Sequence, residues 1–184
     1  MKILMLIDSL GIGGAETHLE ALACELSKLG HSICVVSSGG IIANRMKKMG
    51  IKNIYLPPIT QGKNLNLPNL LNCLKNLQII RSHIKTEAPD IVHAHTRKTA
   101  FLVDGLCKKH KIPLIVTAHA LFSMKLPKSI LSKWGDGTIA VSKDIKNHLI
   151  YHKAKIKNIT IINNGVKMPP KENKYEKNNL CQPS

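Results

Sequence analysis

The stretch "LMLIDSLGIGGAETHLEALACELSKLGH", residues 4–31, decides the fold class of this chain. It opens as an apolar run, passes through a glycine cluster, and continues with apolar residues at helical spacing: Ala15, Leu19, Leu22, Ala23, Leu26 and Leu29. Gly30 is a natural helix stop, and a second apolar run begins at Ser32. These features together predict a strand, a glycine turn, a helix and a second strand.

The same alternation continues to the end of the chain. Seven short apolar runs are expected to be strands, at residues 2–7, 32–37, 53–56, 90–94, 113–118, 138–142 and 158–162. Helical spacing recurs at 67–84 and 99–110, and again from Ile145 to Leu149 after Ser142. Runs that are apolar throughout are typical of strands buried on both faces. We therefore predict an α/β fold: a Rossmann-like, doubly wound, mainly parallel sheet of about seven strands.

The alternation of predicted strands and helices ends near residue 166, and this indicates the domain organisation. Residues 1–166 are expected to form one domain. Residues 167–184 contain two adjacent prolines, several Lys and Asn residues, and little that is apolar, so we expect a linker or a disordered tail.

Charge is the strongest feature of the composition. The chain has 27 Lys and Arg against 11 Asp and Glu, a net charge of +16, and no acidic residue stands between Leu26 and Thr86. Such a surface attracts anions. Three Tyr, two Phe and one Trp provide few stacking platforms, and no helix-turn-helix or zinc-finger pattern is present, so we do not expect nucleic acid. An anionic membrane surface is the candidate partner, and a solvated basic surface without a partner is the alternative.

Cysteine usage and hydropathy indicate the compartment. The five cysteines are scattered and have no C-x-x-C spacing, which predicts reduced thiols that serve in packing. The opening apolar run is too short for a signal peptide or a membrane span. We therefore expect a cytoplasmic protein.

The glycine turn fits neither of two familiar nucleotide motifs. Gly11 and Gly13 match the dinucleotide pattern G-x-G-x-x-G, but Glu16 stands at the third glycine, and Ser37 and Ser38 occupy the place of the ribose-binding acid. A nucleotide-binding oxidoreductase is therefore disfavoured. No Gly-Lys-Ser or Gly-Lys-Thr follows, which excludes a Walker loop. The turn either offers backbone N–H groups to an anion such as a phosphate, or uses glycine for packing alone.

Histidines stand at the ends of two predicted strands. His93 and His95 are two residues apart and share one face of a strand, and His119 ends the next strand. These side chains could hold zinc in principle, but no carboxylate or thiolate is placed to complete the ligand set. No D-x-D pair is present for a sugar-nucleotide cation. We expect no metal.

Five marks in order resemble the N-terminal domain of family 4 glycosyltransferases, retaining enzymes of the GT-B fold. They are "GGAE" at 13–16, "DIVHAH" at 90–95, "VTAH" at 116–119, "AVSKDIKNHL" at 140–149 and "ITIINNGV" at 159–166. The resemblance implies half of a GT-B fold that holds the acceptor. In that family a C-terminal domain grips most of the nucleotide sugar, and the paired glutamates (E-x7-E) of that domain have no counterpart here.

The resemblance also implies roles for individual residues. His119 resembles the family's cleft histidine, which lies against the donor sugar, and a structural histidine at a strand end is the alternative. Gly13 and Gly14 look like the backbone segment that approaches the donor phosphate or sugar. Glu16 either lies with them in the donor cleft or complements the helix dipole.

On the acceptor side, His95 is the expected cleft residue. Arg97 and Lys98 follow it and either meet an acidic or phosphorylated acceptor or are simply solvated.

Taken together, these features predict the N-terminal domain of a retaining glycosyltransferase that requires neither metal nor cofactor. Its expected substrates are a nucleotide-diphosphate sugar and a lipid-linked or surface-polysaccharide acceptor. Its expected place is the inner face of the cytoplasmic membrane, in cell-envelope polysaccharide biosynthesis. The alternative is a catalytically inactive, truncated remnant, or a stand-alone binding subunit that needs a separate donor-binding chain.

Overall fold

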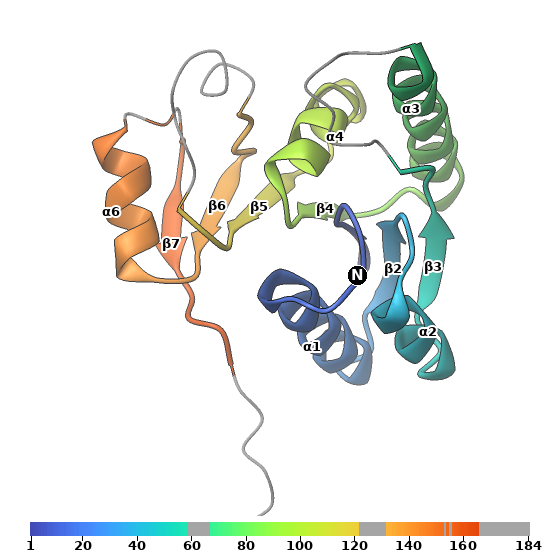
Figure 1. The fold of residues 1–184 in the computed structure, drawn as a ribbon, viewed down its shortest axis with the longest axis horizontal. Coiled ribbons are helices and arrows are strands. Elements are labelled where there is room, and N and C mark those ends of the chain that lie inside the picture. The colour runs from blue at the N-terminus through green and yellow to red at the C-terminus, as the bar shows by residue number, and fades with distance from the viewer. Residues whose placement is uncertain (59–66, 122–131, 153, 155, 166–184) are drawn as a thin grey trace, which may run out of the picture.

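A single parallel sheet organises the chain. The computed structural model describes residues 1–58, 67–121, 132–152, 154 and 156–165. Seven strands pair in the order β3-β2-β1-β4-β5-β6-β7, and every neighbouring pair is parallel (Figure 1). The strands are β1 (Lys2–Leu6), β2 (Ser32–Ser37), β3 (Lys52–Tyr55), β4 (Ile91–Ala94), β5 (Leu114–Ala118), β6 (Gly137–Ala140) and β7 (Ile159–Ile161). All seven predicted strands are confirmed.

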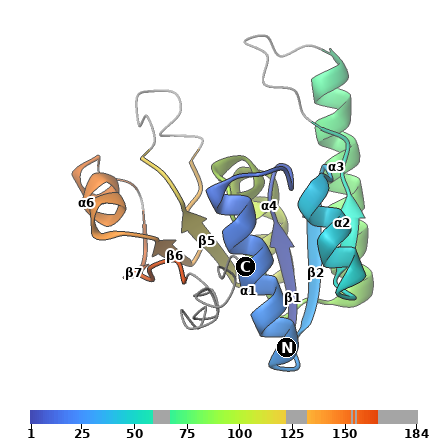
Figure 2. The same ribbon diagram turned by 60° about the horizontal axis from the view of Figure 1, so that its bottom comes forward.

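Helices cover both faces of the sheet. They are α1 (Gly14–Lys28), α2 (Ile41–Lys48), α3 (Leu67–Glu87), α4 (Arg97–His110) and α6 (Lys143–Tyr151). The buried residues of α1 and α2 pack on one face, and those of α3, α4 and α6 pack on the other. Figures 1 and 2 both place α3 at one end of the sheet and α6 at the other. The doubly wound α/β prediction is therefore confirmed.

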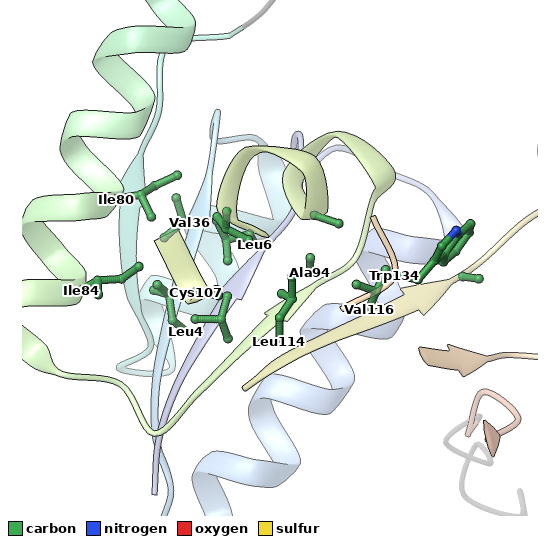
Figure 3. Close-up of a cluster of buried hydrophobic side chains, with 14 of the residues drawn as sticks. Leu4, Leu6, Val36, Ile80, Ile84, Ala94, Cys107, Leu114, Val116 and Trp134 are labelled. Carbon is green, nitrogen blue, oxygen red and sulfur yellow. The ribbon is translucent and has the colours of Figure 1, made fainter. Parts of the chain in front are cut away.

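The apolar runs are continuous because both faces of the central strands are buried. In β1, Leu4 and Leu6 enter the larger core cluster with Ile80 and Ile84 of α3, which Figure 3 shows. The intervening Met5 enters a second cluster with residues of α1 and α2. Helices cover both clusters, so both faces of β1 are buried. For this reason β1 shows no alternation of apolar and polar residues.

Four described cysteines are free thiols: Cys24, Cys34, Cys73 and Cys107. Burial raises the pKa of Cys34 to about 11 and that of Cys107 to about 12, so both thiols are protonated and unreactive at neutral pH. They act as packing residues, as predicted. Cys181 and the predicted tail at 167–184 lie outside the described residues.

Helix α2 was not predicted from the sequence. It has eight residues and buries only Ile42 and Met46, which stand one turn apart. That spacing is the available signal, but it is too short to separate a helix from a loop. Among the described residues, no helix is both long and apolar enough to cross a membrane.

Strand order places a switch point between β1 and β4. The chain runs outward from β1 to β3, then returns to β4 and runs outward the other way. The loops that follow β1 and β4 therefore diverge at the carboxyl edge of the sheet, where ligands bind in folds of this kind.

The loop after β2 is locked against the loop after β1. Leu10 N–H donates to the Gly39 carbonyl at 2.8 Å, and Ile42 N–H donates to the Leu10 carbonyl at 3.0 Å. Gly40 lies between these bonds with a φ of 140°, and a Cβ there would collide with the Leu10 carbonyl. Glycine is therefore required at this position.

We predict that Gly40→Ala lowers the free energy of unfolding by about 1 to 3 kcal/mol, because it adds both backbone strain and a clash with Leu10. Urea denaturation followed by circular dichroism measures the change. Gly105→Ala is the matched control, since no atom lies within 4 Å of its added Cβ in helix α4, and it should be neutral or stabilising by up to about 1 kcal/mol. Equal stability of the two variants would contradict the prediction.

Candidate functional site

Histidines from three elements converge at the switch-point edge. The Nδ1 atom of His95 lies 3.2 Å from the Nε2 atom of His119. The ring of His18 lies 5.8 Å from that of His95 and 5.0 Å from that of His119, measured between centroids. The His93 ring lies 4.2 Å from that of His95, and its Nε2 atom is 2.7 Å from Thr117 Oγ1. The cluster therefore joins helix α1 to strands β4 and β5.

The strand register brings these side chains together. Strands β4 and β5 are hydrogen-bonded neighbours, with Ala94 opposite Val116. His95 and His119 each directly follow the end of one of these strands, so both stand at the same edge of the sheet. The His95 N–H donates to the Leu6 carbonyl at 2.8 Å, which ties this position to β1. His18 reaches the cluster because α1 starts at the glycine turn that follows β1.

Burial keeps these imidazoles neutral. It lowers the pKa of His93 to about 3 and that of His119 to about 4, with smaller contributions from neighbouring histidines. Burial also holds the pKa of His95 well below its usual value, and lowers the pKa of His18. Uncharged imidazoles can donate or accept hydrogen bonds, but they contribute no positive charge to a phosphate.

Two nitrogens of the cluster are unsatisfied. His95 Nε2 and His119 Nδ1 are buried and have no hydrogen-bond partner among the described residues. His95 is 2% exposed, whereas His119 and His18 are half-buried. One nitrogen from each of His18, His95 and His119 lies within 4.8 Å of the others, which is a candidate arrangement for a metal ion.

The structure places His95 and His119, which were predicted for the acceptor side and the donor sugar, in contact with each other. The sequence suggested His93, His95 and His119 as the histidines that could hold a metal ion. In the structure the third member of this set is His18 and not His93, and His18 was not predicted. Its only sequence signal is its position shortly after the glycine turn, on a helix that begins at the same sheet edge.

The glycine turn provides the N-cap of α1. Gly13 is the N-cap residue with an extended backbone, and its carbonyl accepts from the Thr17 N–H at 2.9 Å. A Cβ at Gly13 would collide with the Glu16 carboxylate, whereas one at Gly14 would meet no atom within 4 Å. Glu16 therefore folds back over the start of the helix, which favours its role as a complement to the helix dipole. An anion that approaches Gly13 has to displace this carboxylate.

Arg97 and Lys98, the two cations predicted for the acceptor side, contact different partners. Lys98 Nζ lies 3.5 Å from a carboxylate oxygen of Asp8, and Arg97 donates to Ser132 Oγ at 3.5 Å. Burial lowers the pKa of Arg97. The two cations therefore point to different partners.

Asp8 bridges the switch point and was also missed. Its Oδ1 atom accepts from Thr96 Oγ1 at 3.0 Å. Thr96 in turn caps α4 by accepting from the Thr99 N–H at 3.2 Å. An acid directly after the first strand is the sequence signal that could have indicated Asp8.

A cavity of about 240 Å³ lies at the opposite, amino-terminal edge of the sheet and is lined in part by Lys2, Lys52 and Glu87. Lys52 pairs with the Glu87 carboxylate at 2.8 Å, and Lys2 donates to the Glu87 carbonyl at 2.9 Å. Lys52 and Glu87 neutralise each other and the Lys2 ammonium already has an acceptor, so the histidine cluster is the better candidate site.

The fold and the polar side chains at its switch point define a doubly wound, ligand-binding α/β domain. The family model for glycosyltransferase family 4 matches residues 12–168. The chain belongs to this family.

Curated relatives are glycosyltransferases that act on a lipid. The chain is 27% identical over 143 residues to one of the subunits of the human phosphatidylinositol N-acetylglucosaminyltransferase, covering 76% of the chain and 28% of that protein. It is 25% identical over 123 residues to the GPI3 subunit of the Saccharomyces cerevisiae phosphatidylinositol N-acetylglucosaminyltransferase, covering 65% of the chain and 26% of that protein. The chain thus spans little more than a quarter of the length of these relatives.

Solved structures confirm the predicted half of a GT-B fold. A glycosyltransferase from Rickettsia africae ESF-5 aligns with a TM-score of 0.71 at 25% identity, covering 90% of the chain and 43% of that protein. Anabaena Alr3699/HepE, solved in complex with UDP-glucose, aligns with a TM-score of 0.67 at 19% identity, covering 90% of the chain and 44% of that protein.

We predict that acid destabilises the domain through its buried histidines. An unfolded histidine takes up a proton as the pH falls below about 6.5, whereas His93 and His95 stay neutral, so the unfolded state binds more protons. The contribution of these two histidines to the free energy of unfolding is fully present above about pH 6.5, and it is lost as the pH falls towards their pKa values in the folded protein. Between pH 7.5 and pH 5.5 the free energy of unfolding should fall by about 2 to 3 kcal/mol from these two groups.

Urea titrations at the two pH values measure this change. His93→Gln is the comparison variant, because it removes one of the two groups and should reduce the pH dependence by about half of that amount. Unchanged pH dependence in that variant would show that His93 is not a source of it.

Proposed function

We propose that the chain is the acceptor-side, N-terminal domain of a retaining, metal-independent glycosyltransferase. It serves the transfer of a sugar from a nucleotide-diphosphate sugar to a lipid-linked or surface-polysaccharide acceptor. The observation that carries the proposal is the contact between two uncharged imidazoles, the buried His95 and the half-buried His119, at the switch-point edge of a family 4 domain. The lipid named for the curated relatives and the UDP-glucose bound by the Anabaena enzyme support the substrate classes.

His119 has the freedom to meet the donor sugar. Its Nε2 atom is occupied by His95, while its Nδ1 atom is unsatisfied. A buried nitrogen without a partner costs about 1 to 3 kcal/mol, and a sugar hydroxyl can relieve that cost. His119 then positions the sugar by a hydrogen bond, and His95 fixes the orientation of its ring.

The transfer step requires no nucleophilic side chain. The bond between the anomeric carbon and the diphosphate oxygen breaks, a bond to the acceptor oxygen forms, and the acceptor proton leaves with the diphosphate. The negative charge that develops is stabilised by positive groups and by the start of α1 near Gly13 and Gly14. A donor-binding domain supplies the remaining contacts to the nucleotide.

A stand-alone binding subunit is the second candidate. Each relative compared above is more than twice as long as the part that this chain matches, so transfer and binding have to be tested separately. Intact mass spectrometry of the gene product from its own cells, with bound partners retained, separates the two: a donor-binding domain in the same polypeptide or a bound partner chain supports transfer, and neither supports the binding subunit.

The basic surface fits a membrane role at the cytoplasmic face. Helix α2 exposes Lys47 and Lys48 beside two exposed apolar side chains, Ile41 and Met49. Apolar side chains next to lysines are suited to an anionic lipid surface, where each lysine contributes about 1 kcal/mol. We therefore assign the membrane contact to this helix.

We predict that His119→Ala lowers the transfer rate roughly 100-fold or more, because a hydrogen bond that positions the reacting sugar is lost. The assay uses the chain with its donor-binding domain and a panel of nucleotide sugars that includes UDP-glucose and UDP-N-acetylglucosamine. His31→Ala, at the opposite edge of the sheet, is the control and should retain activity. Full activity of His119→Ala would refute the assignment, and tight donor binding by the 184-residue chain alone would overturn the division between the two domains.

The double variant Lys47→Gln/Lys48→Gln should bind vesicles of phosphatidylserine and phosphatidylcholine roughly 30-fold more weakly, from the loss of about 1 kcal/mol per lysine. Sedimentation with the vesicles measures the partition coefficient. The matched control is Lys109→Gln/Lys111→Gln, which changes the same charge at the end of α4 on the other face of the sheet. An equal loss in both variants would mean that net charge, and not α2, determines binding.

A further inference from the structure

The paired histidines have the spacing of metal ligands. His95 Nδ1 and His119 Nε2 are 3.2 Å apart. In a tetrahedral zinc site with Zn–N bonds of 2.0 to 2.1 Å, neighbouring ligand nitrogens lie about 3.3 Å apart. The pair therefore already spans one edge of such a tetrahedron.

His18 supplies the third corner. One of its nitrogens lies within 4.8 Å of the ligand nitrogens of the other two histidines. His18 comes from α1, while His95 and His119 follow β4 and β5, so the sheet fixes two of the ligands and a helix presents the third. Closing the remaining gap requires His18 to move towards the other two histidines.

The hydrogen bonds of the fold leave this cluster unexplained. His95 is 2% exposed, yet its Nε2 atom has no partner among the described residues, and neither has His119 Nδ1. A buried nitrogen without a partner destabilises the fold. These two unsatisfied atoms are the outer nitrogens of the two rings, whereas the candidate metal ligands are the inner pair, His95 Nδ1 and His119 Nε2.

The ligand chemistry suits a transition-metal ion. A neutral imidazole offers one nitrogen lone pair to a metal. Three imidazoles favour zinc, copper or nickel over magnesium or calcium, which prefer oxygen. The net charge of +16 further disfavours weakly held cations.

We propose that His18, His95 and His119 bind one Zn²⁺ ion, with a fourth position open towards the half-exposed side of His18 and His119. Without the ion, one proton lies between His95 Nδ1 and His119 Nε2. When zinc binds, this proton moves to the other nitrogen of the ring that carried it, and both of the facing nitrogens then offer a lone pair to the ion. Because the open fourth position of the ion faces the side of His119 that is assigned to the donor sugar, zinc competes with the sugar and is a reversible inhibitor of a transfer reaction that itself needs no metal. The inhibition rests on the proposed function, whereas the binding does not.

A second histidine pair has to be separated from this site. His148 and His152 stand one turn apart on α6 and at its end, with ring centroids 4.5 Å apart. Two histidines at that spacing can also bind zinc, through two ligands only. The double variant His148→Ala/His152→Ala removes this pair without touching the cluster.

The test is zinc binding to the full chain after treatment with EDTA. Calorimetric titration with zinc sulfate in the His148→Ala/His152→Ala background should show one ion per chain. Adding His18→Ala should weaken that binding by more than roughly 100-fold, since loss of even an outer partner of a ligand costs 10- to 100-fold. Circular dichroism in EDTA checks that the variants fold, and Co²⁺ in place of Zn²⁺ should give the visible absorption of a tetrahedral site.

Two results would overturn the proposal. One is the absence of binding in the His148→Ala/His152→Ala background, which would assign all zinc to α6. The other is binding that His18→Ala leaves unchanged, which would exclude the three-histidine site. A readout by binding keeps this test separate from transfer: zinc binding without any transferase activity would sustain the site and remove only the proposed function.

Discussion

The structure depends on the burial of β1 between β2 and β4, with both of its faces covered by helices. Met5 and Leu6 are completely buried, on opposite faces of the same strand. This strand fixes the register of both halves of the sheet, because it pairs with β2 on one side and with β4 on the other. A shift of one residue would exchange the two core faces along its whole length. The positions of Asp8, the glycine turn and His95 all follow from that register.

Desolvation then determines the chemistry at the carboxyl edge of the sheet. A chain with a net charge of +16 places its most buried ionisable side chains where they carry no charge. Arg97 and Lys98 follow His95 along the chain, but the centre of the site is made of neutral imidazoles. Recognition of a sugar, which is uncharged and rich in hydroxyl groups, requires that kind of surface more than it requires charge. In the proposed transfer, the phosphates of the donor are left to backbone groups and helix ends.

Much of this arrangement is predictable from the sequence, for physical reasons that differ between elements. The strands are predictable because burial on both faces leaves continuous apolar runs, and α1 because it is long enough to show helical spacing. Helix α2 is not predictable, since two buried residues in eight give too little periodicity. His95 and His119 are indicated by their places at strand ends. His18 is not, because nothing in the sequence says which face of α1 turns towards the strands of the other half. Lys98 and Arg97 show a similar limit: they are adjacent in sequence and have different partners in space.

The contact between Asp8 and Thr96 joins residues that are 88 positions apart. During synthesis, β1 and β2 emerge long before β4, so the second edge of β1 has no partner until β4 has been synthesised. An unpaired apolar edge invites association with other chains. The switch point that creates the site is thus also a seam that cannot close until Ala94 has been synthesised.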